Sequence, residues 1–136
     1  MNIHSQKIYD TIVVGAGISG LSAAYHLKKF SPKAEFLVLE GRDNFGGTWD
    51  FFKYPGIRSD SDMHTLGFSF KPWNSRKFIA DGPAIMNYLD ETIEENNLKD
   101  LIKFNMHIES ASWNSVDSLW ELSINNKKLN LSLIHI

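Results

Sequence analysis

The chain has 136 residues, 43% of them hydrophobic, which is enough for one domain with a buried core. A formal net charge of −2 gives no electrostatic footprint for nucleic acid, and no run of eighteen apolar residues suggests a membrane span. The absence of cysteine excludes disulfides, thiolate metal sites and redox dithiols, and the five histidines lack metal-ligand spacing, so no metal site is predicted.

The first part of the chain predicts a βαβ unit. The first ten residues lack the apolar core of a signal peptide, so we expect a soluble, cytoplasmic protein. Residues 8–14 form a short apolar strand that we expect to be buried on both faces. The glycine turn GAGISG follows, and then a helix that Ser31-Pro32 ends. A second buried strand over residues 34–40 completes a Rossmann-like α/β pattern.

The second part predicts one helix and then an antiparallel β meander near the C-terminus. Asp81 is a candidate N-cap, and Pro83 fits the first turn of a helix through AIMNYLDETIEENN. From residue 102 the pattern changes to strands, IKFNMHIESASW and LWELSI. Asn125-Asn126 is the expected turn before a third strand that begins at KKLN. With few parallel strands, the Rossmann-like domain is expected to be incomplete.

The last six residues, LSLIHI, match one reading frame of a common sequencing-library adapter. We therefore expect residues 1–130 to be the N-terminal part of an FAD/NAD(P)-binding Rossmann-like domain, and residues 131–136 to be a non-native tail. A natural apolar strand end is the alternative. Resequencing through codon 131 separates the two, because a genuine stop after an unchanged LSLIHI would contradict an adapter origin.

Three glycines at the strand-to-helix turn carry the main chemical signal. In G-x-G-x-x-G spacing, Gly15 permits a sharp turn, Gly17 lets a pyrophosphate approach the backbone, and Gly20 lets the helix pack closely on the strand. The helix N-terminus, which includes Ser19, offers free N–H groups and a positive dipole end to phosphates. At the end of the second strand, Glu40 can accept both ribose hydroxyls and disfavours a ribose 2′-phosphate. The combination predicts a dinucleotide site.

The stretch GGTWDFFKYPGIRSDSD, residues 46–62, has neither helical nor strand periodicity, so core packing does not explain it. Gly46-Gly47 can pass close to a pyrophosphate and a ribityl chain, where a side chain would clash. Thr48 can donate a hydrogen bond, and Trp49 can lie against an isoalloxazine edge. A flavin must be held along its whole length, so these features favour FAD over NAD. A glycine-bearing surface loop with an incidental tryptophan is the alternative.

The joined motifs GAGISG, LE-x-R-x-x-x-GGTWD, YPGIRSDSDM and IADGPAI resemble the N-terminus of class B flavoprotein monooxygenases, the flavin-containing and Baeyer–Villiger monooxygenases. The likeness covers about residues 9–124 and is greatest to the Baeyer–Villiger branch that also oxidises sulfur. It implies an oxidoreductase with two dinucleotide domains that uses FAD, NADPH and O₂. Its small-molecule substrate would be a ketone, oxidised to an ester, or a thioether, thioamide or amine, which receives oxygen from a peroxyflavin.

The resemblance also implies a set of site residues. Asp60, the candidate catalytic acid, would orient an arginine further along such a chain, and it would also contact FAD. Arg58 and Ser59 match positions near the nicotinamide, and Ile108 would meet the adenine through its backbone. The other implied FAD contacts are Gly15, Gly17, Ser19, Gly20, Glu40, Gly47, Thr48, Trp49, Asp50 and Phe51.

Several family features are absent from the sequence: the interdomain F-x-G-x-x-x-H signature, a second glycine fingerprint for NADPH, and the catalytic arginine. We therefore expect these 136 residues alone to be inactive, and either to dissolve poorly or to bind FAD weakly. A non-catalytic, stand-alone FAD-binding remnant is the alternative. A disulfide reductase is rejected by the lack of cysteine, and an amine oxidase gives no reason for YPGIRSD.

Overall fold

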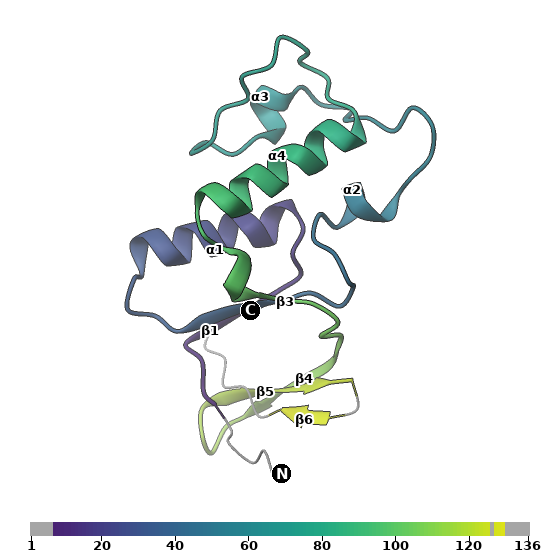
Figure 1. Ribbon diagram of the computed structural model, residues 1–136. Coiled ribbons are helices and arrows are strands. Elements are labelled where there is room, and N and C mark those ends of the chain that lie inside the picture. The colour runs from purple at the N-terminus through teal and green to yellow at the C-terminus, as the bar shows by residue number, and fades with distance from the viewer. Residues whose placement is uncertain (1–6, 126, 130–136) are drawn as a thin grey trace.

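The computed structural model describes residues 7–125 and 127–129 of the chain, and Figure 1 shows their arrangement. The proposed non-native tail, residues 131–136, lies outside the described residues, so its origin stays a prediction. In the described part, no helix is long and apolar enough to cross a membrane.

The elements, in chain order, are β1 (Thr11–Val14), α1 (Ile18–Phe30), β2 (Phe36–Leu39), α2 (Thr48–Phe51), α3 (Met63–Leu66), α4 (Gly82–Glu95), the 3₁₀ turn η1 (Lys99–Leu101), β3 (Ile102–Lys103), β4 (Ile108–Asn114), β5 (Leu119–Ile124) and β6 (Lys127–Leu129). They form a parallel sheet in the order β1-β2-β3 and an antiparallel sheet in the order β4-β5-β6. The predicted α/β fold with a C-terminal meander is confirmed.

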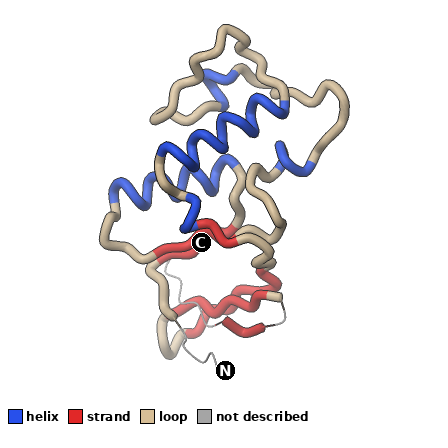
Figure 2. Tube along the Cα trace, in the orientation of Figure 1, coloured by secondary structure: helices blue, strands red, loops and turns tan. Residues whose placement is uncertain are grey.

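The molecule has three layers. Helices α1 and α4 lie on one side of the parallel sheet, and the meander lies on the other side (Figures 1 and 2). Apolar side chains of α1, α4, β2 and β3 form one core, which includes Leu21, Val38 and Leu89. A smaller core joins the two sheets and consists of Ile12, Leu39, Leu122 and Ile124. The parallel sheet is therefore covered on both faces, as a βαβ unit requires.

The segment expected to be one strand, IKFNMHIESASW, is two strands in different sheets. Its first two residues form β3, in which Ile102 pairs in parallel with Val38 of β2. The chain then turns at Asn105, which has a positive φ of 56°. Its remainder forms β4, which begins at Ile108 and pairs with β5. The prediction of a single strand was wrong because apolar patterning does not show which sheet a strand joins.

Strand β1 is less buried than the sequence suggested. Ile12 is fully buried, but Val14 at the end of the strand is 52% exposed. Among the residues that the structure describes, β1 pairs with β2 alone, so its other edge is open. The expected burial on both faces therefore holds for Ile12 and fails at Val14.

Candidate functional site

The turn from β1 into α1 has the backbone that its three glycines predict. Gly15 has a φ of +95°, which an L side chain rarely adopts, and its N–H donates a 2.8 Å hydrogen bond to the Leu39 carbonyl of β2. A Cβ atom at Gly20 would overlap the carbonyl oxygen of Gly15. The first turn of α1 therefore lies directly against the glycine turn, as the motif requires.

The N-terminus of α1 is open to a ligand. Its N-cap, Gly17, has extended backbone and makes no side-chain cap hydrogen bond. Ser19 in the first turn is exposed. The first-turn N–H groups of a helix have no partner within the helix, and they lie at the positive end of its dipole. This end of α1 is thus suited to an anion such as a pyrophosphate.

Glu40 directly follows β2 and is only 9% exposed. Its Oε2 accepts a 2.8 Å hydrogen bond from the N–H of Ala16, inside the glycine turn. Its Oε1 accepts a 3.0 Å hydrogen bond from the N–H of Arg42. The carboxylate is therefore fixed beside the turn by two backbone donors, and each of its oxygens keeps a lone pair for a ribose hydroxyl.

The loop after β2 also reaches the glycine turn. The N–H of Gly46 donates a 2.9 Å hydrogen bond to the Ala16 carbonyl. Gly47 has a φ of +54°, and a Cβ atom there would lie 3.2 Å from Cα of Gly17. Two backbone segments far apart in sequence thus approach each other closely, at a position where the positive φ and the tight contact of Gly47 favour glycine, and they form a narrow backbone cradle.

The side chains of α2 point in different directions. Thr48 and Phe51 are exposed, whereas Trp49 is partly buried and packs against the helical core. Asp50 is 5% exposed, and its carboxylate contacts Arg42 and Asn44 of the preceding loop. Of these residues, Thr48, Trp49 and Phe51 present surface on which a ligand could lie.

The segment with Arg58 and Ser59 lies along the start of α4. Arg58 forms an antiparallel bridge with Asp81, and the N–H of Ser59 donates a 2.9 Å hydrogen bond to the Ala80 carbonyl. The Ser59 side chain is buried, and its hydroxyl donates to the Ser61 carbonyl. Asp60 between them is exposed. The loop thus holds Ser59 inward and leaves the Asp60 carboxylate at the surface.

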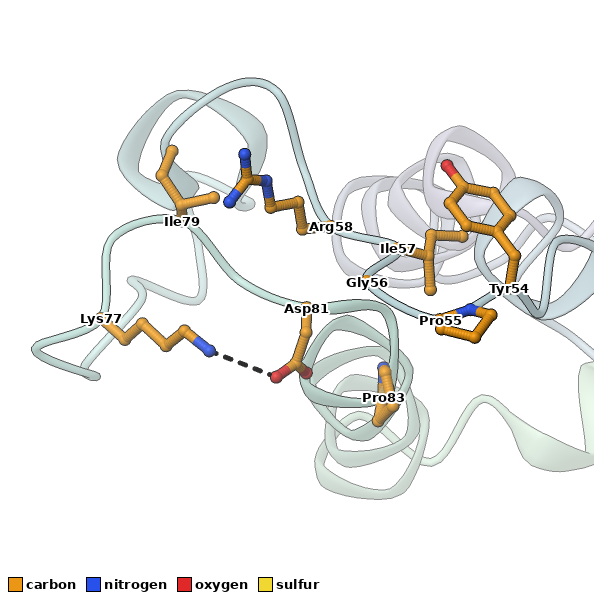
Figure 3. Close-up of a pocket in the computed structure, with 9 residues that line it drawn as sticks. All are labelled: Tyr54, Pro55, Gly56, Ile57, Arg58, Lys77, Ile79, Asp81 and Pro83. Carbon is orange, nitrogen blue, oxygen red and sulfur yellow. Dashed lines mark hydrogen bonds and ion pairs between the residues drawn. The ribbon is translucent and has the colours of Figure 1, made fainter.

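An open cavity of about 670 Å³ lies beside this segment. Figure 3 shows Arg58 extending along Ile79 and away from Asp81, which forms an ion pair of 3.3 Å with Lys77. The cavity combines apolar walls with charged groups, and its lining residues are Tyr54, Pro55, Gly56, Ile57, Arg58, Lys77, Ile79, Asp81 and Pro83. Neither Ser59 nor Asp60 lines it.

Two other acids in this region have structural roles. Asp62 caps α3, because its carboxylate accepts hydrogen bonds from Thr65 Oγ1 and from the N–H groups of Thr65 and His64. These hydrogen bonds lower the pKa of Asp62, and the bond from Thr65 Oγ1 has the largest effect. Asp81 caps α4 as predicted, and the hydrogen bond from the Ala84 N–H lowers its pKa. Both carboxylates stabilise helix starts.

The structure gathers the predicted residues into two groups. Around the glycine turn lie the residues of the G-x-G-x-x-G motif, Glu40 and Gly47. Ile108 starts β4 two residues beyond Met106, whose N–H donates a 2.9 Å hydrogen bond to the Glu40 carbonyl. The second group, residues 58–60, lies against α4.

Sequence reasoning missed other residues that contact Asp50 or line the cavity: Arg42, Asn44, Tyr54, Lys77 and Ile79. They lie in aperiodic loops, so no spacing pattern pointed to them. A signal was available for three of them, because Arg42 stands in the LE-x-R motif, Tyr54 begins YPGIRSDSDM and Ile79 begins IADGPAI.

Comparisons with known proteins identify the family of the chain. Residues 13–92 match the family model described as an NAD(P)-binding Rossmann-like domain. The chain is 52% identical over 116 residues, 85% of its length, to the FAD-containing monooxygenase EthA of Mycolicibacterium smegmatis, and it covers 24% of that protein. It is 51% identical over 125 residues, 90% of its length, to the probable FAD-binding monooxygenase AlmA of an Acinetobacter species, covering 25% of it.

Solved structures give the same result. A steroid monooxygenase bound to NADP superposes with a TM-score of 0.84 at 29% identity, over 93% of this chain and 25% of that one. A closed cyclohexanone monooxygenase superposes with a TM-score of 0.81 at 26% identity, over 93% and 24%. The chain thus spans about a quarter of the length of the relatives it matches. It belongs to the family of NAD(P)-binding Rossmann-like domains and, as its motifs predicted, is related to the FAD-containing monooxygenases.

Proposed function

We propose that this chain is the FAD-binding part of a monooxygenase that uses NADPH and O₂. The enzyme would insert one oxygen atom into a ketone, or transfer one to the sulfur or nitrogen of a small organic substrate. The observation that carries this proposal is the meeting of the glycine turn, the Glu40 carboxylate and the Gly47 backbone at one end of the parallel sheet. The names of the relatives EthA and AlmA support FAD as the dinucleotide.

The residues present fit FAD. At the cradle, Gly17 and Gly47 bring two backbone segments close together without side chains, so a group that must approach the backbone can lie against both. Gly17 is also the N-cap of α1, whose first turn offers uncapped N–H groups to a pyrophosphate. The Glu40 carboxylate, held by two backbone donors, offers its remaining lone pairs to the ribose hydroxyls. The site thus offers hydrogen-bond donors to the phosphates and hydrogen-bond acceptors to the ribose hydroxyls.

Further contacts follow from the same geometry. The exposed Ser19 hydroxyl can donate to a phosphate oxygen. We assign the backbone at Ile108 to the adenine, because Met106, two residues before it, donates its N–H to the Glu40 carbonyl. The exposed Thr48 hydroxyl can donate to the flavin end of the dinucleotide, and Trp49 excludes water from it.

The segment after the cradle is suited to the second cofactor. We assign Arg58 to the NADPH side of the site because it places a cation at the wall of the cavity, and we assign Ser59 with it on the family resemblance alone. The exposed Asp60 carboxylate is free to orient a cation of a neighbouring segment. Bound FAD supplies the redox chemistry and the activation of O₂, and the residues of this chain bind, orient and exclude water.

FAD binding tests the proposal directly. The chain is titrated into FAD and the quenching of flavin fluorescence is followed. Glu40→Gln should weaken binding about 10- to 100-fold, because a hydrogen bond to a charged group is worth about 1.5–3 kcal/mol. The side-chain NH₂ of the introduced glutamine would also face the backbone N–H of Ala16 or Arg42, so that one donor would meet another. A wild-type chain that leaves flavin fluorescence unchanged would contradict the FAD site.

The oxygenation step needs the protein in its full natural length. We expect NADPH oxidation that depends on an added cyclic ketone or thioether and yields the ester or the sulfoxide. Substrate-independent NADPH oxidation with no oxygenated product, in an FAD-loaded protein, would leave the FAD site standing and reject the monooxygenase assignment.

A further inference from the structure

A buried carboxylate on α2 is engaged by the loop that connects β2 to α2. The Asp50 side chain is 6% exposed, and its Oδ2 lies 2.8 Å from Nη2 of Arg42. Its Oδ1 accepts a 2.8 Å hydrogen bond from Nδ2 of Asn44. The Arg42 guanidinium also lies over the Phe51 ring, 5.0 Å from its centroid. The carboxylate therefore ties two positions of the loop to α2.

The loop that Asp50 holds is the one that contacts the glycine turn. Its Arg42 N–H donates to Oε1 of Glu40, and its Gly46 N–H donates to a carbonyl of the turn. A buried carboxylate is tolerated only when it is paired, so loop conformations that keep Arg42 and Asn44 on Asp50 are strongly favoured. The network that satisfies Asp50 thus also fixes Glu40 and the glycine cradle.

We propose that Asp50 is a positioning residue of the dinucleotide site. Its side chain acts through Arg42 and Asn44, which hold residues 41–47 against the glycine turn. It does not itself touch the dinucleotide, although the family resemblance implies an FAD contact at this position. Its side chain is 6% exposed and is covered by Arg42 and Asn44, and a carboxylate beside a pyrophosphate would be repelled. The effect on cofactor binding rests on the proposed FAD site, whereas the effect on the loop does not.

Amide hydrogen exchange of the cofactor-free chain tests the effect on the loop. Asp50→Asn should speed exchange across residues 41–47 about tenfold or more, while α4 stays protected. Lys53→Gln is the matched control: Lys53 lies 3.7 Å from the same carboxylate but is 75% exposed, so its loss should change nothing. Unchanged exchange across 41–47 in Asp50→Asn overturns the proposal. If Asp50→Asn also loses protection in α4, Arg42→Gln replaces it as the test variant, because it keeps the hydrogen bond between Asn44 and Asp50. Unchanged exchange across residues 41–47 in Arg42→Gln then overturns the proposal.

FAD titration separates positioning from direct contact. Asp50→Asn and Arg42→Gln should each weaken FAD binding about tenfold, and the double variant should be no weaker than either single one, since both break the same link. Additive losses, or weaker binding of FAD by Asp50→Asn with unchanged exchange, indicate direct contact and overturn the proposal. A wild-type chain that binds no FAD contradicts the proposed FAD site alone, because the exchange result still decides the role of Asp50 in the loop.

Discussion

Gly47 combines a backbone constraint with a close approach. Its φ of +54° is unfavourable for any L side chain, and a Cβ atom would lie 3.2 Å from Cα of Gly17. We expect Gly47→Ala to lower the free energy of unfolding by about 1–2 kcal/mol from the positive φ alone. It should also weaken FAD binding, because the methyl group presses against the Gly17 backbone and shifts the cradle. Urea unfolding and flavin fluorescence measure the two effects.

Gly56→Ala is the matched control for that substitution. Gly56 also has a positive φ, +83°, but a Cβ atom there would meet nothing within 4 Å. It should therefore show the same loss of stability with unchanged FAD binding. Equal losses of FAD binding in the two variants would show that backbone strain, and not the cradle, is responsible.

Single residues differ in how far the sequence predicts them. Gly15 and Gly20 were predictable because each satisfies a backbone requirement within one short motif. Glu40 was predictable because a parallel strand places its end beside the turn. The engagement of Asp50 by Arg42 was not predictable, because it depends on how an aperiodic loop folds back on a one-turn helix.

At the scale of elements, one tyrosine connects α4 to the loop that precedes it. The Tyr88 hydroxyl accepts a 2.8 Å hydrogen bond from the Phe68 N–H and donates one of 2.6 Å to the Lys71 carbonyl. The Lys71 ammonium is held by Glu91 and Glu95 of the same helix. Burial lowers the pKa of Lys71, but these carboxylates outweigh that effect and raise it overall. The loop that leads to the cavity wall is thus anchored on α4.

Removing the Tyr88 hydroxyl should lower the free energy of unfolding and change its dependence on pH. Tyr88→Phe leaves a buried N–H and a carbonyl unpaired, so we expect a loss of about 1–3 kcal/mol near neutral pH. Burial raises the pKa of Tyr88 above its usual 10.0. The contribution of the protonated Tyr88 hydroxyl to the free energy of unfolding is therefore complete below pH 10, and it is lost as pH rises through the higher pKa of the native state. Urea unfolding from pH 7 to 11 should show a smaller alkaline loss in Tyr88→Phe.

Tyr54→Phe controls for the removal of a tyrosine hydroxyl, because Tyr54 is exposed at the cavity. It should keep both the stability and the alkaline profile of the unsubstituted chain. An alkaline loss that is the same in Tyr88→Phe as in the unsubstituted chain would rule out the hydroxyl as its source.

The two long helices, α1 and α4, were predicted, whereas the one-turn helices α2 and α3 were missed because four residues show no periodicity. The start of α4 follows from the Asp81 cap and Pro83, and its buried face from apolar residues at helical spacing. The split between β3 and β4 was hidden, because both carry similar apolar patterns. Only the parallel pairing of Ile102 with Val38 assigns β3 to the first sheet.

At the scale of the molecule, the open edge of β1 is the main unprotected feature. Within the described ranges β1 pairs with β2 alone, and an apolar hollow of about 610 Å³ lies between β1 and α1. Val14 and Phe30 beside it are more than half exposed. An exposed strand edge with apolar side chains is a template for pairing with another chain. We therefore attribute the expected poor solubility of these 136 residues to pairing between chains at the open edge of β1.

We expect Val14→Lys to reduce self-association, because a lysine on a strand edge must lose its hydration when another strand pairs there. Val116→Lys is the control: Val116 is 93% exposed in the turn between β4 and β5, so it adds the same charge away from the edge. Sedimentation velocity over a range of concentrations measures the oligomer fraction. The edge is the contact if Val14→Lys alone lowers that fraction. Equal reductions by both lysines would show that net charge controls association, and no reduction by either would place the contact elsewhere.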